Sequence, residues 1–142
     1  MITRPEEHLS LLFTNNIIYF DQGVLYQGNW LNARTTIDYN CYWDVRTKNP
    51  KFHDDLLFTD WQKHGYDKHS IVADPLFVNP LQFDFRFKNN AIARKIKFKP
   101  FDYSKAGVYG SDEWIQKARM GTELEEKFDQ KVSSCENQNH ND

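Results

Sequence analysis

Apolar residues along this chain fall in short runs that are separated by Asn, Asp, Gly and Pro. Residues 9–20 and 35–43 are rich in β-branched and aromatic side chains, and residues 24–26 form a shorter run between two Gly-containing breaks. Runs of this composition with such boundaries are typical of β-strands. The N-terminal third of the chain is therefore predicted to be made of strands.

Two of these runs resemble each other when they are aligned at an offset of 24 residues. The aligned pairs are Phe13 with Ile37, Asn16 with Asn40, Ile17 with Cys41, and Tyr19 with Trp43. A period of this length is typical of a solenoid, in which each turn of chain stacks on the next. An Asn that recurs at one place can bond to the backbone of a bend and to the next Asn. The alternative is a chance similarity between two strands.

Further along, two apolar bursts at 75–78 and 83–87 are too short for helices, and Pro, Asn or Asp residues bound them. We expect each to be a single strand of the same stacked structure. A short helix is predicted over 59–64, with Thr59 as its N-cap, Gly65 as its stop and Trp61 packed inward. A helical turn is predicted over 91–96. Residues 112–131 favour helix, interrupted at Gly121.

The segment from 61 to 107 resembles the last coils of right-handed parallel β-helix repeat proteins, the pectate-lyase-like proteins of polysaccharide-degrading bacteria. The run 61–78 (WQKHGYDKHSIVADPLFV) carries the pattern W-x-x-x-G-x-D-x-H-S-x-x-A-D-P-L-F-V, and 84–88 (DFRFK) fits the strand that follows it. The ending fits at 97–107, except that Lys97 stands where Gly is usual, and 89–91 reads Asn-Asn-Ala where Ser-Pro-Ala is usual. The likeness covers about residues 9–110.

The predicted fold class is accordingly all-β: a partial right-handed parallel β-helix of two to three C-terminal coils, with short helices and a C-terminal helix. The expected domains are a partial β-helix over 1–110, a helical extension over 111–132, and a tail over 133–142 that is disordered by composition. The resemblance implies that the chain is the end of a longer protein, and that the middle coils, which generally carry the catalytic groups of this family, are missing.

Composition adds an uneven charge distribution to this picture. The net charge is −2, so the chain as a whole is not predicted to bind nucleic acid. Seven Lys or Arg residues lie between 85 and 105 against one Asp, whereas 111–142 holds eight acids and four bases. A solvated basic face is the simpler interpretation. The more specific interpretation is a basic surface that binds an acidic polysaccharide.

No apolar run is long enough to span a membrane, and the N-terminus lacks the apolar core of a signal peptide. We therefore expect no membrane partner, and a secreted or periplasmic location only if the chain is part of a longer parent. Of the two cysteines, Cys41 is predicted to be a small buried residue, and Cys135 lies in the polar tail. They form no zinc motif.

Asp67, Lys68 and His69 form the best candidate site, because a carboxylate and an imidazole at a groove edge can bind sugar hydroxyls or move a proton. The alternative is that Asp67 caps a turn and that His69 bonds to the backbone. Trp30, in a Gly/Asn-rich loop, is a candidate for stacking on a sugar ring, or else an anchor beneath the loop.

Cofactors and metals are not expected. The weak exception is calcium at His53, Asp54 and Asp55, which lack the spaced carboxylates of a calcium loop. Asp21, Asp38 and Asp44 lie in or after strands, where turn formation is a better explanation for an Asp than acid catalysis, which needs two carboxyl groups at a set separation. The sequence therefore assigns no catalytic residue.

These features favour one function and leave two alternatives. The preferred hypothesis is the C-terminal part of a carbohydrate-active protein of polysaccharide lyase or glycoside hydrolase type, not catalytic by itself, with a polysaccharide or oligosaccharide as partner. The first alternative is a complete lyase or hydrolase that uses Asp67 and His69. The second is a structural capping or interaction module without activity. Self-association through an open β-helix end is expected if no further coils precede it.

Overall fold

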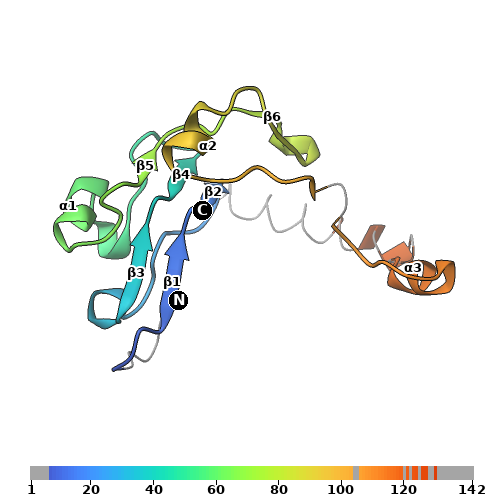
Figure 1. Ribbon diagram of the computed structural model, residues 1–142, viewed down its shortest axis with the longest axis horizontal. Helices are drawn as coiled ribbons and strands as arrows, with labels where there is room; N and C mark the ends of the chain where they lie inside the picture. The colour runs from blue at the N-terminus through green and yellow to red at the C-terminus, as the bar shows by residue number, and fades with distance from the viewer. Residues whose placement is uncertain are drawn as a thin grey trace. The chain divides into compact units, whose positions relative to one another are not determined.

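The computed structural model describes residues 7–103, 106–119, 121, 123–124, 126–127 and 130. The chain divides into two compact units, Met1–Pro100 and Phe101–Asp142. The first unit holds all the strands found among the described residues (Figure 1). The second contains α3 (Asp112–Ala118), where the sequence predicted a helix. The predicted tail over 133–142, with Cys135, lies outside the described residues.

The first unit begins with two stacked turns of chain, each made of a strand, a bend and a strand. β1 (Leu11–Thr14) pairs in parallel with β3 (Thr35–Asp38), and β2 (Ile17–Phe20) pairs in parallel with β4 (Cys41–Asp44). We call each of these turns of chain a layer, so that β1 and β2 belong to the first layer and β3 and β4 to the second. Phe13 is opposite Ile37, and Ile17 is opposite Cys41. The alignment at an offset of 24 is thus confirmed as the pairing register. The Asn ladder is also present, because the Asn16 Nδ2 donates to Asn40 Oδ1 at 3.1 Å and to the Thr14 carbonyl at 3.0 Å.

The third layer departs from this period. β5 (Ile71–Val72) pairs with β4 in parallel, and Ile71 is opposite Cys41, at an offset of 30 residues. The chain between β4 and β5 contains a 3₁₀ turn (His53–Asp55) and the helix α1 (Phe58–Lys63). The helix begins one residue before the predicted one and has Leu57 as its N-cap, so the predicted Thr59 cap is wrong.

The predicted stacking of the two later bursts is also wrong. β6 (Phe77–Asn79) and β7 (Asp84–Phe87) pair with each other in antiparallel fashion, with Phe77 opposite Phe87. The 3₁₀ turn Pro80–Gln82 reverses the chain between them, because Pro80 fits the first position of such a turn and Phe83 adopts a left-handed conformation after it. α2 (Ala91–Lys95) follows, as predicted.

The expected all-β, right-handed parallel β-helix is therefore corrected. The described chain holds three small separate sheets, in the orders β1-β3, β2-β4-β5 and β6-β7, together with helices. Two physical reasons explain the difference: the third layer keeps only a two-residue strand, and the next two strands satisfy each other's hydrogen bonds in a hairpin.

The core of the first unit is aromatic. Trp61 of α1 is fully buried, as predicted, and its ring lies between those of Tyr26 and Tyr66, at 4.7 and 4.5 Å between centroids. The other buried members of this cluster are Trp30 (in the 3₁₀ turn Trp30–Asn32), Ile37, Tyr42 and Phe52. Large rings supply most of the buried apolar area in a chain with few aliphatic core residues.

Candidate functional site

The structure separates the residues predicted for the site, and Asp67 lies inside the core. Its side chain is fully buried at the turn between α1 and β5. The backbone there is left-handed (φ 49°), a conformation that Asp tolerates better than most residues. Gln62 Nε2 donates to the Asp67 carbonyl at 2.8 Å, which ties this turn to α1.

Four side chains donate hydrogen bonds to the Asp67 carboxylate. The Trp61 indole Nε1 donates to Oδ2 at 2.7 Å, and Tyr42 lies 3.0 Å from both oxygens. Asn40 Nδ2 and the Ser70 hydroxyl donate to Oδ1 at 3.2 and 2.5 Å. Because Tyr42 donates to the carboxylate, its oxygen accepts the short hydrogen bond from the Tyr26 hydroxyl.

Burial raises the pKa of Asp67, and these donors offset part of that effect because they stabilise the ionised form. Burial likewise raises the pKa of Tyr42, so its hydroxyl keeps its proton and remains a donor. The carboxylate therefore joins the second and third layers. It does not reach the surface, and the contact with a ligand that the sequence suggested for Asp67 is corrected to a structural role.

Trp30 is likewise a core residue, only 8% exposed. Its indole Nε1 donates to the Gln27 carbonyl at 2.9 Å, and the Tyr26 ring meets it edge-on at 4.8 Å. The residue anchors the loop from beneath, which was one of the two roles considered for it.

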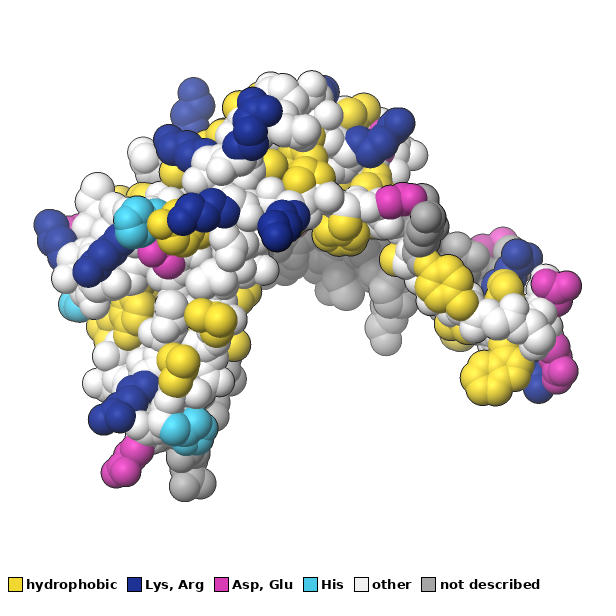
Figure 2. All heavy atoms as spheres, viewed as in Figure 1, with side chains coloured by type: hydrophobic (Ala, Val, Ile, Leu, Met, Phe, Trp, Pro, Cys, Tyr) yellow, Lys and Arg dark blue, Asp and Glu magenta, His cyan; other side chains and the backbone are white. Residues whose placement is uncertain are grey.

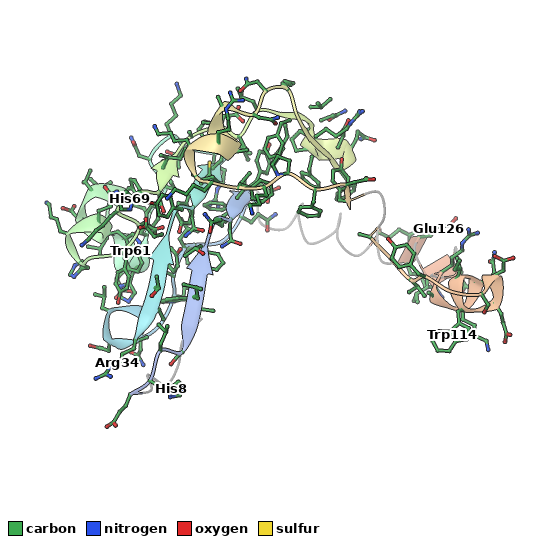
Figure 3. The ribbon with its side chains drawn as sticks, viewed as in Figure 1. His8, Arg34, Trp61, His69, Trp114 and Glu126 are labelled. Carbon is green, nitrogen blue, oxygen red and sulfur yellow. The ribbon has the colours of Figure 1, made fainter. Side chains whose placement is uncertain are left out.

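His69, by contrast, lies at the surface, and Figure 3 labels it beside the buried Trp61. Its side chain is 59% exposed. The Asp38 carboxylate holds both its backbone and its ring: the backbone N–H donates to Oδ1 and Nδ1 lies against Oδ2, each at 2.7 Å. Among the described residues the other ring nitrogen, Nε2, has no hydrogen-bond partner, so it is available to a ligand.

The same contacts change the pKa of Asp38. Partial burial acts to raise its pKa, but hydrogen bonds from His69 and from the Tyr39 backbone outweigh it, and the pKa is lowered. The carboxylate is ionised near neutral pH and accepts three hydrogen bonds, two at Oδ1 and one at Oδ2. Its role is to orient the imidazole, with Nδ1 turned inward and Nε2 outward.

The His69 ring stacks on Tyr39, with 4.7 Å between centroids and planes 7° apart. This spacing matches the distance between neighbouring strands, because the two residues occupy equivalent positions of successive layers. The Lys97 ammonium lies 3.8 Å from the centre of the Tyr39 ring, in a cation–π contact. Since the imidazole already covers one face of Tyr39, the ammonium covers the other.

Lys97 reaches this position through an unusual backbone conformation. Its φ is 57°, in the left-handed region where glycine is favoured, directly after α2. The neighbouring Ile96 carbonyl accepts a hydrogen bond from Asn15 Nδ2 at 2.8 Å, which fastens this turn to the first layer. A lysine that is kept in a glycine conformation and placed on an aromatic ring indicates a use for its charge.

Lys68, the third predicted residue, is exposed beside His69. Other basic residues of the described chain lie on the exposed surface of α2 and of the segments around it, namely Lys88, Arg94, Lys95 and Lys99. Figure 2 shows dark blue side chains gathered over this part of the first unit. We call Lys68, His69, Tyr39, Asp38 and Lys97 the His69 surface.

The weak calcium prediction at His53, Asp54 and Asp55 gains no support from the described residues. His53 is buried, and its Nε2 lies 2.7 Å from the Gly28 carbonyl. Within the described ranges, no group of three or more His, Cys, Asp or Glu side chains is placed to hold a metal ion. Asp44 is occupied as well, since Arg46 donates to both of its oxygens at 2.8 Å.

One pocket of about 390 Å³ lies elsewhere, between the segment after β4 and the start of α1. Its walls are formed by Lys48, Asn49, Pro50, Leu57, Phe58, Thr59 and Val72. They are mostly apolar, and Lys48 brings one cation to them. This pocket is the natural comparison site for any binding experiment.

The sequence missed Tyr39 and Lys97 as parts of a site, and it offered Asp38 only as a turn-forming residue or an acid catalyst, not as a partner of His69. The available signal was a third repeat at an offset of 30, which aligns Tyr39 with His69 and Asn40 with Ser70. In the sequence, Lys97 stands out only as a departure from the glycine that the resemblance implies.

Fold and site together describe a small mixed α and β unit with an exposed His–Tyr–Lys stack. Comparisons with protein-family models, with curated proteins and with solved structures found no match. No helix among the described residues has the length and apolar character needed to cross a bilayer.

Proposed function

We propose that this chain binds an acidic polysaccharide at the His69 surface and does not itself cleave it. The observation that supports this most is the exposed His69 ring, which follows Lys68 in the sequence and stacks on Tyr39, while the Lys97 ammonium lies over the other face of Tyr39. An aromatic face with cations beside it suits a sugar ring that carries a carboxylate.

Each residue has a separate part in this recognition. The outer face of His69 packs on the sugar ring, because Tyr39 already covers its inner face. His69 Nε2 and the Lys68 ammonium bind the carboxylate of this sugar, and the Lys97 ammonium, on the other face of Tyr39, binds the carboxylate of a neighbouring sugar in the polymer. Tyr39, covered on both faces, positions the imidazole and the Lys97 ammonium. Neutral glycans lack the carboxylate and bind less tightly.

The arrangement of the acids favours binding over cleavage. Glycoside hydrolysis uses a pair of carboxyl groups on either side of the scissile bond. Here Asp67 is buried, Asp44 is paired with Arg46, and Asp38 accepts three hydrogen bonds from His69 and Tyr39. A secreted or periplasmic location, expected only if the chain is part of a longer parent, stays a prediction that agrees with this proposal.

The test is affinity electrophoresis of the full chain in gels that contain polygalacturonate, alginate or neutral xylan. His69→Ala removes the stacking face. Lys97→Gly removes the cation and suits the left-handed backbone, so the lost cation–π contact is offset by relieved strain of about 1 kcal/mol. Lys48→Ala, in the separate pocket, is the matched control.

We expect the wild-type chain to be retarded by the acidic polymers more than by xylan, and the retardation to weaken as salt rises. His69→Ala and Lys97→Gly should each weaken binding about tenfold, whereas Lys48→Ala should not change it. Equal retardation of all variants, or loss only in Lys48→Ala, would refute the proposed site. Release of new polymer ends by the wild-type chain would refute the non-cleaving part of the proposal.

A further inference from the structure

The strands of the first layer each have a partner on one side only. β1 pairs with β3 and β2 pairs with β4, and no other described strand joins either of them (Figure 1). β1 and β2 follow each other directly along the chain, joined by Asn15 and Asn16. Together they form an edge of strand, bend and strand, which we call the first-layer edge.

The backbone groups along β2 show which of its atoms lie on this edge. Cys41 N–H donates to the Asn16 carbonyl at 2.8 Å, and Val45 N–H donates to the Phe20 carbonyl at 3.0 Å. Alternate residues of a parallel strand turn their backbone groups to opposite sides. Ile17 and Tyr19 therefore turn their N–H and carbonyl groups away from β4, toward the open edge.

A side-chain acceptor stands on the same edge. Between layers, the backbone N–H at the bend donates to a side-chain oxygen of the next layer: Asn16 N to Asn40 Oδ1 at 3.0 Å, and Asn40 N to Ser70 Oγ at 2.7 Å. The equivalent acceptor of the first layer is Asn16 Oδ1, and it accepts no hydrogen bond from any described residue. The ladder thus begins with an unused acceptor.

The side chains of this edge carry none of the usual protection of an exposed strand. Leu9, Leu11 and Leu12 are 60, 37 and 64% exposed. No charged residue and no Pro occurs between 9 and 20, whereas exposed edges are ordinarily guarded by such residues. An unguarded apolar edge indicates that it has a partner.

We propose that the first-layer edge binds a parallel polypeptide segment of strand, bend and strand, whose bend N–H donates to Asn16 Oδ1. The sequence predicted self-association at this end if no further coils precede it, but the direction of the ladder argues for a different segment. A second copy related by a two-fold axis would bring its own Asn16 oxygen to the contact, so that two acceptors would meet with no donor. This inference is independent of the His69 surface.

The chain itself supplies a probe, since residues 33–44 contain this pattern with a bend N–H at Asn40. A fluorescent synthetic peptide of that sequence is titrated with the full chain under reducing conditions, and its anisotropy is measured. The same peptide with a methylated backbone nitrogen at the position of Asn40 is the second probe. Leu12→Lys is compared with Leu81→Lys, a leucine that is 82% exposed at the hairpin turn.

We expect the peptide to bind, and Leu12→Lys to weaken binding about tenfold or more, because an edge lysine opposes strand addition. Leu81→Lys should bind like the wild type. N-methylation should weaken binding by a similar factor, since it removes the donor for Asn16. Circular dichroism confirms that both variants keep their fold.

Four results would overturn the proposal or a part of it. The first is an unchanged anisotropy, and the second is equal binding by Leu12→Lys and Leu81→Lys. The third is dimerisation of the wild-type chain that Leu12→Lys abolishes and that excess peptide does not displace, which would assign the edge to a second copy. Equal binding of the methylated peptide would refute the donor to Asn16 and, with it, the parallel orientation.

Discussion

Asp67→Asn should destabilise the first unit strongly although the substitution changes only one atom of the side chain. The left-handed backbone at Asp67 suits Asn as well as Asp, so no new strain arises. What changes is the hydrogen bonding, because one acceptor oxygen becomes an NH₂ group that can only donate. Every effect of the variant therefore comes from the buried network.

The magnitude follows from the donors around the carboxylate. If the NH₂ group replaces Oδ2, it meets the Trp61 indole N–H, which lies at 2.7 Å and cannot rotate. If it replaces Oδ1, it meets the Asn40 amide, at 3.2 Å. A buried donor without a partner costs about 1–3 kcal/mol, and the lost charge-assisted bonds add a similar amount. Relief from burying the charge offsets part of this sum, which leaves about 2–4 kcal/mol.

The assay is urea unfolding of the full chain, followed by near-ultraviolet circular dichroism of the buried aromatic residues. With a slope of about 1–3 kcal/mol per molar urea, the midpoint should fall by about 1–2 M. The control is Asp60→Asn, which removes an exposed ion pair with Lys63 and should cost less than about 1 kcal/mol. Equal midpoints for the two variants would refute the view that the Asp67 carboxylate holds the layers together.

The remaining predictions concern the ladder, the acids and the buried thiol. Asn40→Ala should lower the free energy of unfolding, measured in urea, by about 2–4 kcal/mol, because Asn40 is fully buried and its side chain makes four hydrogen bonds. Asn16→Ala should lower it less, because Asn16 is only half-buried. Equal losses of unfolding free energy would contradict this prediction. Hydrogen bonds from Arg46 lower the pKa of Asp44, so the stability it contributes is full above the ordinary carboxyl pKa and is lost as pH falls through the folded pKa. Asp44→Asn should therefore flatten the acid side of the stability curve, and an unchanged curve would count against the pair. Burial raises the pKa of Cys41 to about 12, so its thiol should be unreactive in the folded chain. In a Cys135→Ser variant, Cys41 should react with a disulfide reagent only after urea unfolds the chain. A fast reaction of the folded chain would show that the thiol is accessible.

The sign of the Asp67 titration is opposite to that of Asp44. Its pKa is raised, so the folded state binds the proton more tightly than the unfolded state does. Its contribution to stability is then full below the unfolded pKa and falls as pH rises through the folded pKa. The difference in unfolding free energy between the wild type and Asp67→Asn should accordingly shrink with rising pH, and a difference that grows would contradict the raised pKa.

The pairing of the first two layers was predictable because residues that pair in parallel, in-register strands are similar and recur at a constant offset in the sequence. Phe13 aligns with Ile37, an apolar pair, and Asn16 aligns with Asn40, an amide pair. The residues of each pair are neighbours in the structure. The hairpin was not predictable in the same way. The bursts of β6 and β7 have the composition of any short strand, and only the turn at Pro80–Gln82 decides that they pair with each other.

The site was only partly predictable, because its residues are distant in the sequence and come together only in the folded chain. Asp67 has the same local sequence whether its carboxylate faces solvent or Trp61, and its donors come from positions 40, 42, 61 and 70. Lys97 lies on Tyr39 across 58 positions of sequence, the difference between the two residue numbers. No periodic pattern connects them.

The change of offset from 24 to 30 residues accounts for both the core network and the exposed site. The lengthened layer contains α1, which is six residues long, as many as the increase in offset. α1 brings Trp61 to the Asp67 carboxylate and, through Gln62, fixes the turn that precedes His69. From this turn the His69 ring reaches Tyr39 and Asp38 of the second layer. The irregular repeat that breaks the expected solenoid therefore also positions the His69 surface.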